Sequence, residues 1–119
     1  AITGFPNLFT ITGPGSPSVL ANMIVGIEQH VDWIADCLTY LHTNKLRTVE
    51  ASATAEQGWV NLVNDIANET LYPTGCNSWY TGANIPGKPR IFMPYLGYPS
   101  YVEKCNDVAE NGYRGFVLK

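Results

Sequence analysis

Hydrophobic residues recur at helical spacing over the longest patterned stretch of the chain. Six of them lie three or four positions apart and predict one stripe of an α-helix: Ile24, Ile27, Val31, Ile34, Leu38 and Leu41. We expect the helix to begin between Ser18 and Ala21 and to end near Thr43. Asn44 suits the stop. The stripe is predicted to be core rather than a ligand channel.

The sequence also predicts how three other side chains of this helix pack. Trp33 and Tyr40 lie off the stripe, and we expect them to pack on a neighbouring domain. His30 lies near the stripe, and this position favours a packed, hydrogen-bonded histidine over a catalyst.

Two shorter helices are predicted downstream. Residues 54–57, Thr-Ala-Glu-Gln, have the spacing of a capping box, and the helix behind them should fade near Thr70. Residues 100–103, Ser-Tyr-Val-Glu, repeat that spacing, and Gly112 is the natural stop of the helix that follows.

Short runs rich in β-branched and aromatic residues predict strands at 8–12, 91–95 and 115–118. The first run leads into a stretch, 13–23, that contains Gly13, Pro14, Gly15 and Pro17 before the long helix begins. Ser16 or Ser18 could cap that helix. A strand, a glycine-rich turn and a helix N-terminus together make an electropositive notch that favours a negatively charged group. A simple turn in the chain is the alternative interpretation.

Composition narrows the possible partners. The chain has 119 residues, 45% hydrophobic and 14% charged, which is typical of one globular domain or a piece of one. A net charge of −3 argues against nucleic acid held by bulk electrostatics. No apolar run approaches the roughly 20 residues of a membrane span.

The cysteines indicate a reducing, cytoplasmic setting. Cys37, Cys76 and Cys105 are odd in number and far apart, which argues against a disulfide framework. Neither they nor the two histidines have metal-ligand spacing, so we expect no metal site.

Several sequence runs resemble one enzyme family. They are Gly-Phe-Pro-Asn-Leu-Phe at 4–9, Gly-Pro-Gly-Ser-Pro-Ser at 13–18, Ile-Glu-Gln-His-Val-Asp-Trp-Ile at 27–34, Ser-Trp-Tyr-Thr-Gly-Ala-Asn-Ile-Pro-Gly-Lys-Pro-Arg at 78–90 and Gly-Tyr-Arg-Gly-Phe at 112–116. Together they resemble the C-terminal part of a Baeyer–Villiger monooxygenase of the phenylacetone, steroid and cyclic-ketone type. The run at 78–90 is the most specific of them.

The resemblance implies a flavoenzyme that uses FAD, NADPH and O₂ to oxidise a ketone to an ester or lactone through a peroxyflavin. It implies an α/β fold: the C-terminal segment of an FAD-binding, Rossmann-like dinucleotide-binding flavoprotein, with three helices, short strands and a long loop. Residues 1–45 would end the FAD-binding domain, and residues 46–119 would form a C-terminal lobe. The rest of the same enzyme chain would then be the segment's main partner.

The family's cofactor motifs are absent from this chain. It has no Gly-x-Gly-x-x-Gly, and it lacks the family's Phe-x-Gly-x-x-x-His-x-x-x-Trp signature and its active-site arginine. We therefore expect no catalytic residue in this segment, and a fragment that is inactive alone.

The resemblance also assigns cofactor and substrate contacts to the loop before the long helix. It places the backbone of Met23 at the FAD isoalloxazine, where a helix N-terminus would stabilise negative charge. Ser18, Val19 and Leu20 would line the ketone side of the pocket.

The aperiodic run 71–89 overlaps a predicted lid at 77–90. A loop of this length inside a compact domain is usually functional or mobile. Gly82 and Gly87 would be its hinges, and the resemblance puts Trp79 at the NADP ribose. Solvated surface roles are expected for Lys88 and Arg90.

Two other functions fit the sequence. One is a flavin monooxygenase that oxidises nitrogen or sulfur. The other is a non-catalytic interaction module that exposes the aromatic residues Trp79 and Tyr80.

Overall fold

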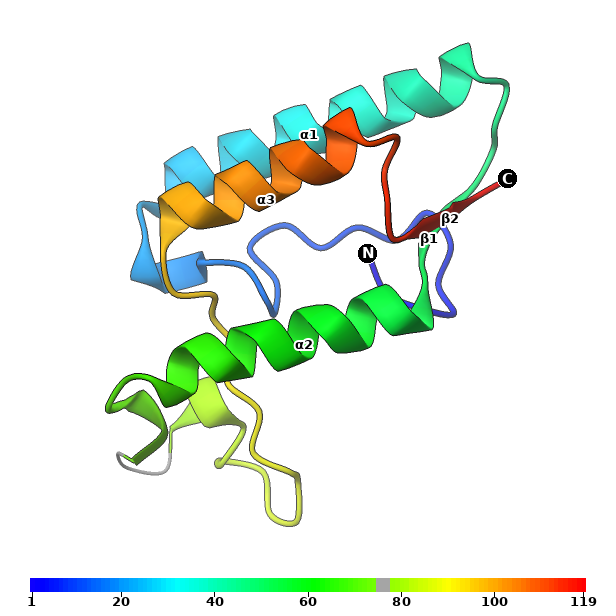
Figure 1. Ribbon diagram of the computed structural model, residues 1–119. Helices are drawn as coiled ribbons and strands as arrows, with labels where there is room; N and C mark the ends of the chain where they lie inside the picture. Colours follow the sequence, from blue (N-terminus) through cyan, green and yellow to red (C-terminus); the bar gives the residue numbers. More distant parts are fainter. Residues whose placement is uncertain (75–77) are drawn as a thin grey trace.

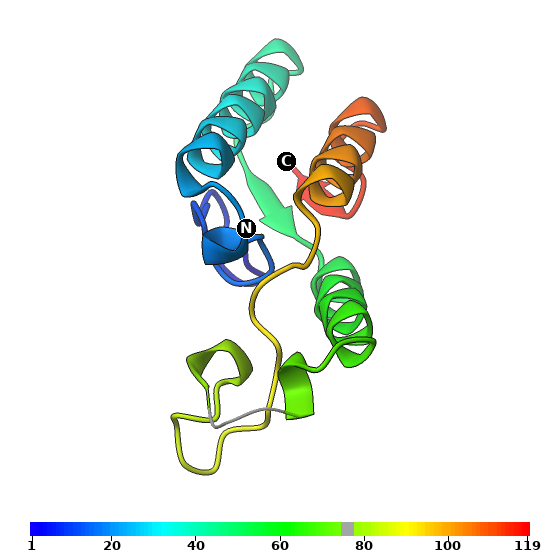
Figure 2. The same cartoon turned by 90° about the vertical axis from the view of Figure 1, so that its left-hand side faces the viewer.

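The computed structural model describes residues 1–74 and 78–119, so Cys76 and the first residue of the predicted lid lie outside the described residues. Three α-helices dominate it: α1 (Met23–Thr43), α2 (Ala53–Asn68) and α3 (Tyr98–Glu110). Helices α1 and α3 lie side by side, and the N-terminal segment runs between them and α2 (Figures 1 and 2). Three 3₁₀ turns complete the helical elements: η1 (Ser18–Leu20), η2 (Tyr72–Thr74) and η3 (Trp79–Thr81).

The predicted helices are confirmed, but their starts differ from the predictions. Helix α1 begins at Met23 because Asn22, and neither Ser16 nor Ser18, caps it by accepting hydrogen bonds from the amides of Ile24 and Val25. Ser52 caps α2, two residues before the predicted capping box.

Helix α3 begins at Tyr98 with proline in its first turn, so it does not use the cap that residues 100–103 predicted. At the other ends, Asn44 is the C-cap of α1, and Gly112 follows α3 with a positive φ of 66°.

Two strands form one small antiparallel sheet, in which β1 (Val49–Ala51) pairs with β2 (Phe116–Leu118). Strand β2 confirms the prediction at 115–118, whereas β1 was not predicted. The predicted strands at 8–12 and 91–95 are wrong for this structure. Residues 91–95 hydrogen-bond to two other segments instead of a strand. The amides of Ile91 and Met93 donate to carbonyls of η3, and the amide of Tyr95 donates to the Ser16 carbonyl. Residues 11–12 form a turn instead of pairing with a strand.

The core consists of two clusters. Cys37 and Leu41 of α1 pack with Val49 and Tyr113. Val63 and Ala67 of α2 pack in the other cluster, whose remaining buried members are aromatic: Phe92, Tyr95 and Tyr101.

The predicted core stripe of α1 is mostly on the surface, which corrects the prediction. The exposed fractions are 70% for Ile24, 46% for Val31 and 51% for Leu38. The buried residues of α1 are His30, Cys37 and Leu41, of which only Leu41 belongs to the predicted stripe. Within the described residues, nothing covers the face that carries the three exposed residues.

The off-stripe aromatics pack on residues 46–119, as expected for contacts with a neighbouring domain, and these contacts are part of the core of this chain. Trp33 and Tyr40 contact the Tyr113 ring with centroid distances of 5.2 and 5.0 Å. Trp33 also donates a 2.9 Å hydrogen bond from Nε1 to the Cys105 carbonyl on α3.

No helix in the described part of the chain combines the length and apolar character needed to cross a membrane.

The two faces of α1 predict different costs for the same substitution. Leu41 is 5% exposed, so Leu41→Ala should lower the free energy of unfolding of the 119-residue chain by about 2–5 kcal/mol. Leu38→Ala, one turn away on the open face, should cost less than about 0.5 kcal/mol. Urea unfolding of both variants measures the difference in the free energy of unfolding. Equal losses of stability would show that Leu38 is a core residue like Leu41.

Candidate functional site

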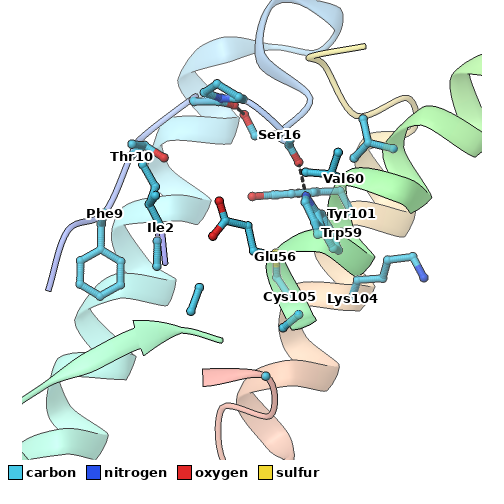
Figure 3. Close-up of a pocket in the computed structure, with 18 of the residues that line it drawn as sticks. Ile2, Phe9, Thr10, Ser16, Glu56, Trp59, Val60, Tyr101, Lys104 and Cys105 are labelled. Carbon is cyan, nitrogen blue, oxygen red and sulfur yellow. Dashed lines mark hydrogen bonds between the residues drawn. The ribbon is translucent and has the colours of Figure 1, made fainter. Parts of the chain in front are cut away.

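The loop before α1 depends on other segments for its backbone hydrogen bonds. The Gly15 amide donates to the Met93 carbonyl at 2.6 Å, and the Tyr95 amide donates to the Ser16 carbonyl at 2.8 Å. Trp59 of α2 donates from Nε1 to the Gly15 carbonyl at 2.9 Å. Figure 3 shows Trp59 reaching from α2 toward the loop at Ser16. The loop is therefore fixed by α2 and by the segment before α3.

Glycine is required at position 15 for two reasons. Its φ of +80° is a conformation that side-chain-bearing residues rarely adopt. A Cβ there would also lie 2.7 Å from Nε1 of Trp59, inside contact distance. The close approach of the indole to this backbone is what permits the Trp59 hydrogen bond.

The first turn of α1 leaves one amide available. The Asn22 side chain accepts from the amides of Ile24 and Val25, and the Asn22 carbonyl accepts from Gly26. Within the described residues, only the Met23 amide of the first four helical amides lacks a protein partner. A 21-residue helix adds its dipole at that point. This end of α1 can donate to one anionic or carbonyl oxygen through the Met23 backbone.

Three predicted pocket residues form the single turn η1 between the loop and α1. Ser18 adopts a positive φ of 47°, a strained conformation for serine. Val19 is 45% exposed, whereas Leu20 packs against the cluster built around Val63 and Tyr95. Leu20 is thus partly a core residue, and Val19 is the more accessible of the two.

Ser18 and Trp79 both line a small cavity of about 90 Å³, together with Thr12, Gly13, Pro14, Met93 and Pro94. The structure thereby brings together a predicted pocket residue and the predicted lid residue. Val19, Leu20 and Met23 do not line this cavity.

The predicted lid has an anchored base and an exposed tip. At the base, the Ser78 side chain accepts from the Tyr80 amide, and Thr81 is buried. The Met93 amide donates to the Tyr80 carbonyl at 2.7 Å. Residues 84–91 are exposed. Gly82 and Gly87, the predicted hinges, both have positive φ.

Trp79 lies on the surface of the lid base. Half of it is exposed, and its ring packs on Tyr80 with a centroid distance of 4.3 Å. Its indole N–H has no protein acceptor among the described residues. A flat apolar face and an available donor are therefore accessible at one position.

A larger cavity of about 540 Å³ lies between the N-terminal segment and the three helices (Figure 3). None of the predicted site residues lines it. Glu56, Trp59 and Tyr101 face it from α2 and α3, and His30 faces it from α1. Hydrogen bonds from the Thr3 side chain and amide lower the pKa of Glu56, which ties this carboxylate to the N-terminal segment. No sequence signal beyond the aromatic content of these helices pointed to the cavity.

Comparisons with known proteins identify the segment. No protein-family model matches the chain. Cyclopentanone 1,2-monooxygenase of a Comamonas strain is 39% identical over 119 residues, which cover 99% of this chain and 22% of that enzyme. A solved steroid monooxygenase bound to NADP superposes with a TM-score of 0.89 at 44% identity, over 99% of this chain and 21% of that one. The chain is homologous to the C-terminal segment of Baeyer–Villiger monooxygenases.

Two further similarities bear on cofactors and on the reaction. The structure of OTEMO in complex with FAD and NADP has a TM-score of 0.84 and 30% identity, over 99% of this chain and 21% of that one. A phenazine N-monooxygenase of Lysobacter antibioticus is 34% identical over 119 residues, 99% of this chain and 21% of that enzyme. The chain thus spans about a fifth of the length of the Baeyer–Villiger monooxygenases and related enzymes that it matches.

The Gly15 contact predicts a local effect on the stability of this chain. Gly15→Ala should reduce the free energy of unfolding by about 1–3 kcal/mol more than Gly4→Ala, because only residue 15 adds overpacking against Trp59. Gly4 is the matched control, since its φ of +82° is the same and no atom lies within 4 Å of its Cβ position. Chemical unfolding followed by tryptophan fluorescence measures both. Equal costs would mean that backbone strain alone matters at Gly15.

Proposed function

We propose that this chain is the C-terminal part of an FAD- and NADPH-dependent Baeyer–Villiger monooxygenase that oxidises ketones to esters or lactones. The observation that carries the proposal is the match over 99% of the chain, at 44% identity and a TM-score of 0.89, to a steroid monooxygenase bound to NADP. Residues 78–90, the most specific run of the sequence, lie inside that match.

We place residues 1–45 at the end of a Rossmann-like FAD-binding domain and residues 46–119 in a C-terminal lobe. On this proposal, the upstream part of the same polypeptide covers the open face of α1. Ile24, Val31 and Leu38 of that face are between 46% and 70% exposed in the chain by itself. Burying them would be favourable by about 25 cal/mol for each Å² of apolar surface removed from water.

The loop and the beginning of α1 fit a flavin edge. The available Met23 amide and the helix dipole would bind a flavin oxygen and stabilise the negative charge that develops there on reduction. Ser18, Val19 and Leu20 would line the ketone side, with Val19 the most accessible. When bound, FAD and NADPH supply hydride transfer and oxygen activation.

Trp79 suits the nicotinamide cofactor. Its indole N–H would donate to a ribose hydroxyl while its exposed face covers the adjoining ring. Hinging at Gly82 and Gly87 would let residues 77–90 close over the site and exclude water. The small cavity lined by both Ser18 and Trp79 supports a lid base close to the proposed ketone pocket.

Cys37 and Cys105 are free thiols, which agrees with a cytoplasmic location. Burial raises the pKa of Cys37 to about 11, so this thiol is unreactive near neutral pH.

The complete enzyme should convert a cyclic ketone to its lactone, consuming NADPH and O₂, and mass spectrometry of the products tests this. The 119-residue chain alone should show neither FAD binding nor turnover. The phenazine N-monooxygenase among the relatives favours N-oxidation as the second candidate, so an aromatic N-heterocycle should be assayed in parallel. N-oxide without lactone would replace the first proposal with the second. A complete protein without flavin would overturn both in favour of an interaction module.

Trp79→Ala in the complete enzyme should weaken NADPH binding by about tenfold, because one hydrogen bond and a stacking surface are lost. It should also raise the hydrogen peroxide formed per NADPH consumed. Folding stability should change by less than about 0.5 kcal/mol, since the side chain is half exposed. Trp79→Phe, which keeps the ring and lacks the N–H, is the matched control and should show an intermediate affinity. Unchanged affinity and coupling in Trp79→Ala would exclude the contact.

A further inference from the structure

His30 joins the loop to two helices. It is 8% exposed and lies in the second turn of α1. The Thr12 amide donates to its Nδ1 at 3.1 Å, and its Nε2 lies 2.8 Å from the Tyr101 hydroxyl of α3. The His30 and Tyr101 rings also meet edge to face, with centroids 5.6 Å apart.

These bonds define the protonation state of the imidazole. A backbone amide can only donate, so Nδ1 must be unprotonated, and Nε2 must carry the proton that it donates to Tyr101. A proton on Nδ1 would face the Thr12 amide donor to donor and break that bond. The arrangement is stable only with a neutral ring.

The residue that His30 holds is strained. Thr12 has a φ of +51°, unfavourable for a β-branched residue, and it directly precedes the loop that begins at Gly13. Tyr101 contacts Trp59, which donates to the Gly15 carbonyl. The loop is therefore held at Thr12 by His30 and at Gly15 by Trp59, and Tyr101 contacts both of these side chains.

We propose that His30 is a positioning residue for the oxygenation reaction: its neutral imidazole fixes Thr12, and thereby the loop leading to Ser18 and Met23, and protonation of the ring releases that loop. The inference rests on the proposed function for the identity of what the loop contacts. We call the hydrogen bonds of His30 to Thr12 and Tyr101 the His30 latch; its existence rests only on this chain's own hydrogen bonds.

The surroundings of His30 favour the neutral ring. Burial lowers its pKa from the ordinary 6.5. The other titratable or charged side chains that line the cavity of about 540 Å³ beside His30 are Lys88, Glu56 on α2, Tyr101, Lys104 and Cys105 on α3, and Arg114.

Because the pKa is depressed in the folded state, the stabilisation is complete above pH 6.5 and is lost as the pH falls from 6.5 through the folded-state pKa.

The first test measures the protonation state of the His30 ring and does not depend on enzyme activity. In the complete enzyme with ¹⁵N-labelled histidine, His30 is assigned by the signals that His30→Asn removes. At pH 7 its Nδ1 should be unprotonated and its Nε2 protonated, and it should titrate below pH 6.5. A proton on Nδ1 at pH 7 would overturn the proposal.

The second test compares pH profiles of ketone oxidation. In the wild type, kcat/KM and the coupling of NADPH use to product should fall as the pH drops through the folded-state pKa of His30, which lies below 6.5. His30→Asn, whose Oδ1 can still accept from Thr12 and does not titrate, should stay active with a flattened acid limb. His30→Gln, which can reach Tyr101 but offers Thr12 no acceptor, should lower kcat/KM about tenfold at every pH.

His42→Asn is the matched control, because His42 lies exposed in the last turn of the same helix and should leave the profile unchanged. If the wild-type enzyme forms no lactone at any pH, the proposed function fails, and the NMR result still decides the latch. If the wild type is active and both His30 variants reproduce its profile, the latch is wrong.

Discussion

The backbone of residues 12–16 makes one backbone hydrogen bond within itself, from the Ser16 amide to the Gly13 carbonyl, and the other partners of its backbone groups tie the three helices together. Prolines and positive φ values prevent a regular ladder in this stretch. Its partners come from α1 through His30, from α2 through Trp59 and from the segment before α3 through Met93 and Tyr95. Tyr101 packs against His30 and Trp59, so α3 supports both connections. Any shift of one helix would leave a polar group of the loop unpaired, which is costly in a buried site.

Local patterns predicted the helices well because a helix satisfies its own backbone. All three were found, and the ends near Asn44 and Gly112 were right because their stop signals act within one turn. Starts were harder to predict: Asn22 and Ser52 lie beside other candidate caps, and only the backbone angles decide which residue serves. Strands depend on a partner elsewhere in the chain. The runs 8–12 and 91–95 have the β-branched and aromatic composition of strands, yet neither forms a ladder within the described residues.

The candidate site was predictable in outline. The glycine-proline loop, the turn at Ser18 and the exposure of Trp79 could be predicted from the positions of glycine and proline and from the resemblance to the enzyme family. The shared cavity of Ser18 and Trp79 could not, because it joins segments some sixty residues apart. The roles of Trp59 and Thr12 were also missed. Neither residue type signals a loop anchor, and each acts through a contact that exists only after the helices have packed.

In α1, the residues of the apolar repeat and the residues that are buried are largely different. The repeat from Ile24 to Leu41 records which face is apolar, whatever covers it. The chain by itself buries His30 and Cys37, which lie off the repeat, together with Leu41 at its end, against β1, Tyr113 and α3. A helix with apolar residues on both sides is typical of an element that is buried on both sides. On the proposal that an upstream domain covers the open face, α1 lies between that domain and the lobe that carries the lid. The loop at its first turn, fixed by His30 on one side, is then the point where movement of the lobe would reach the flavin edge.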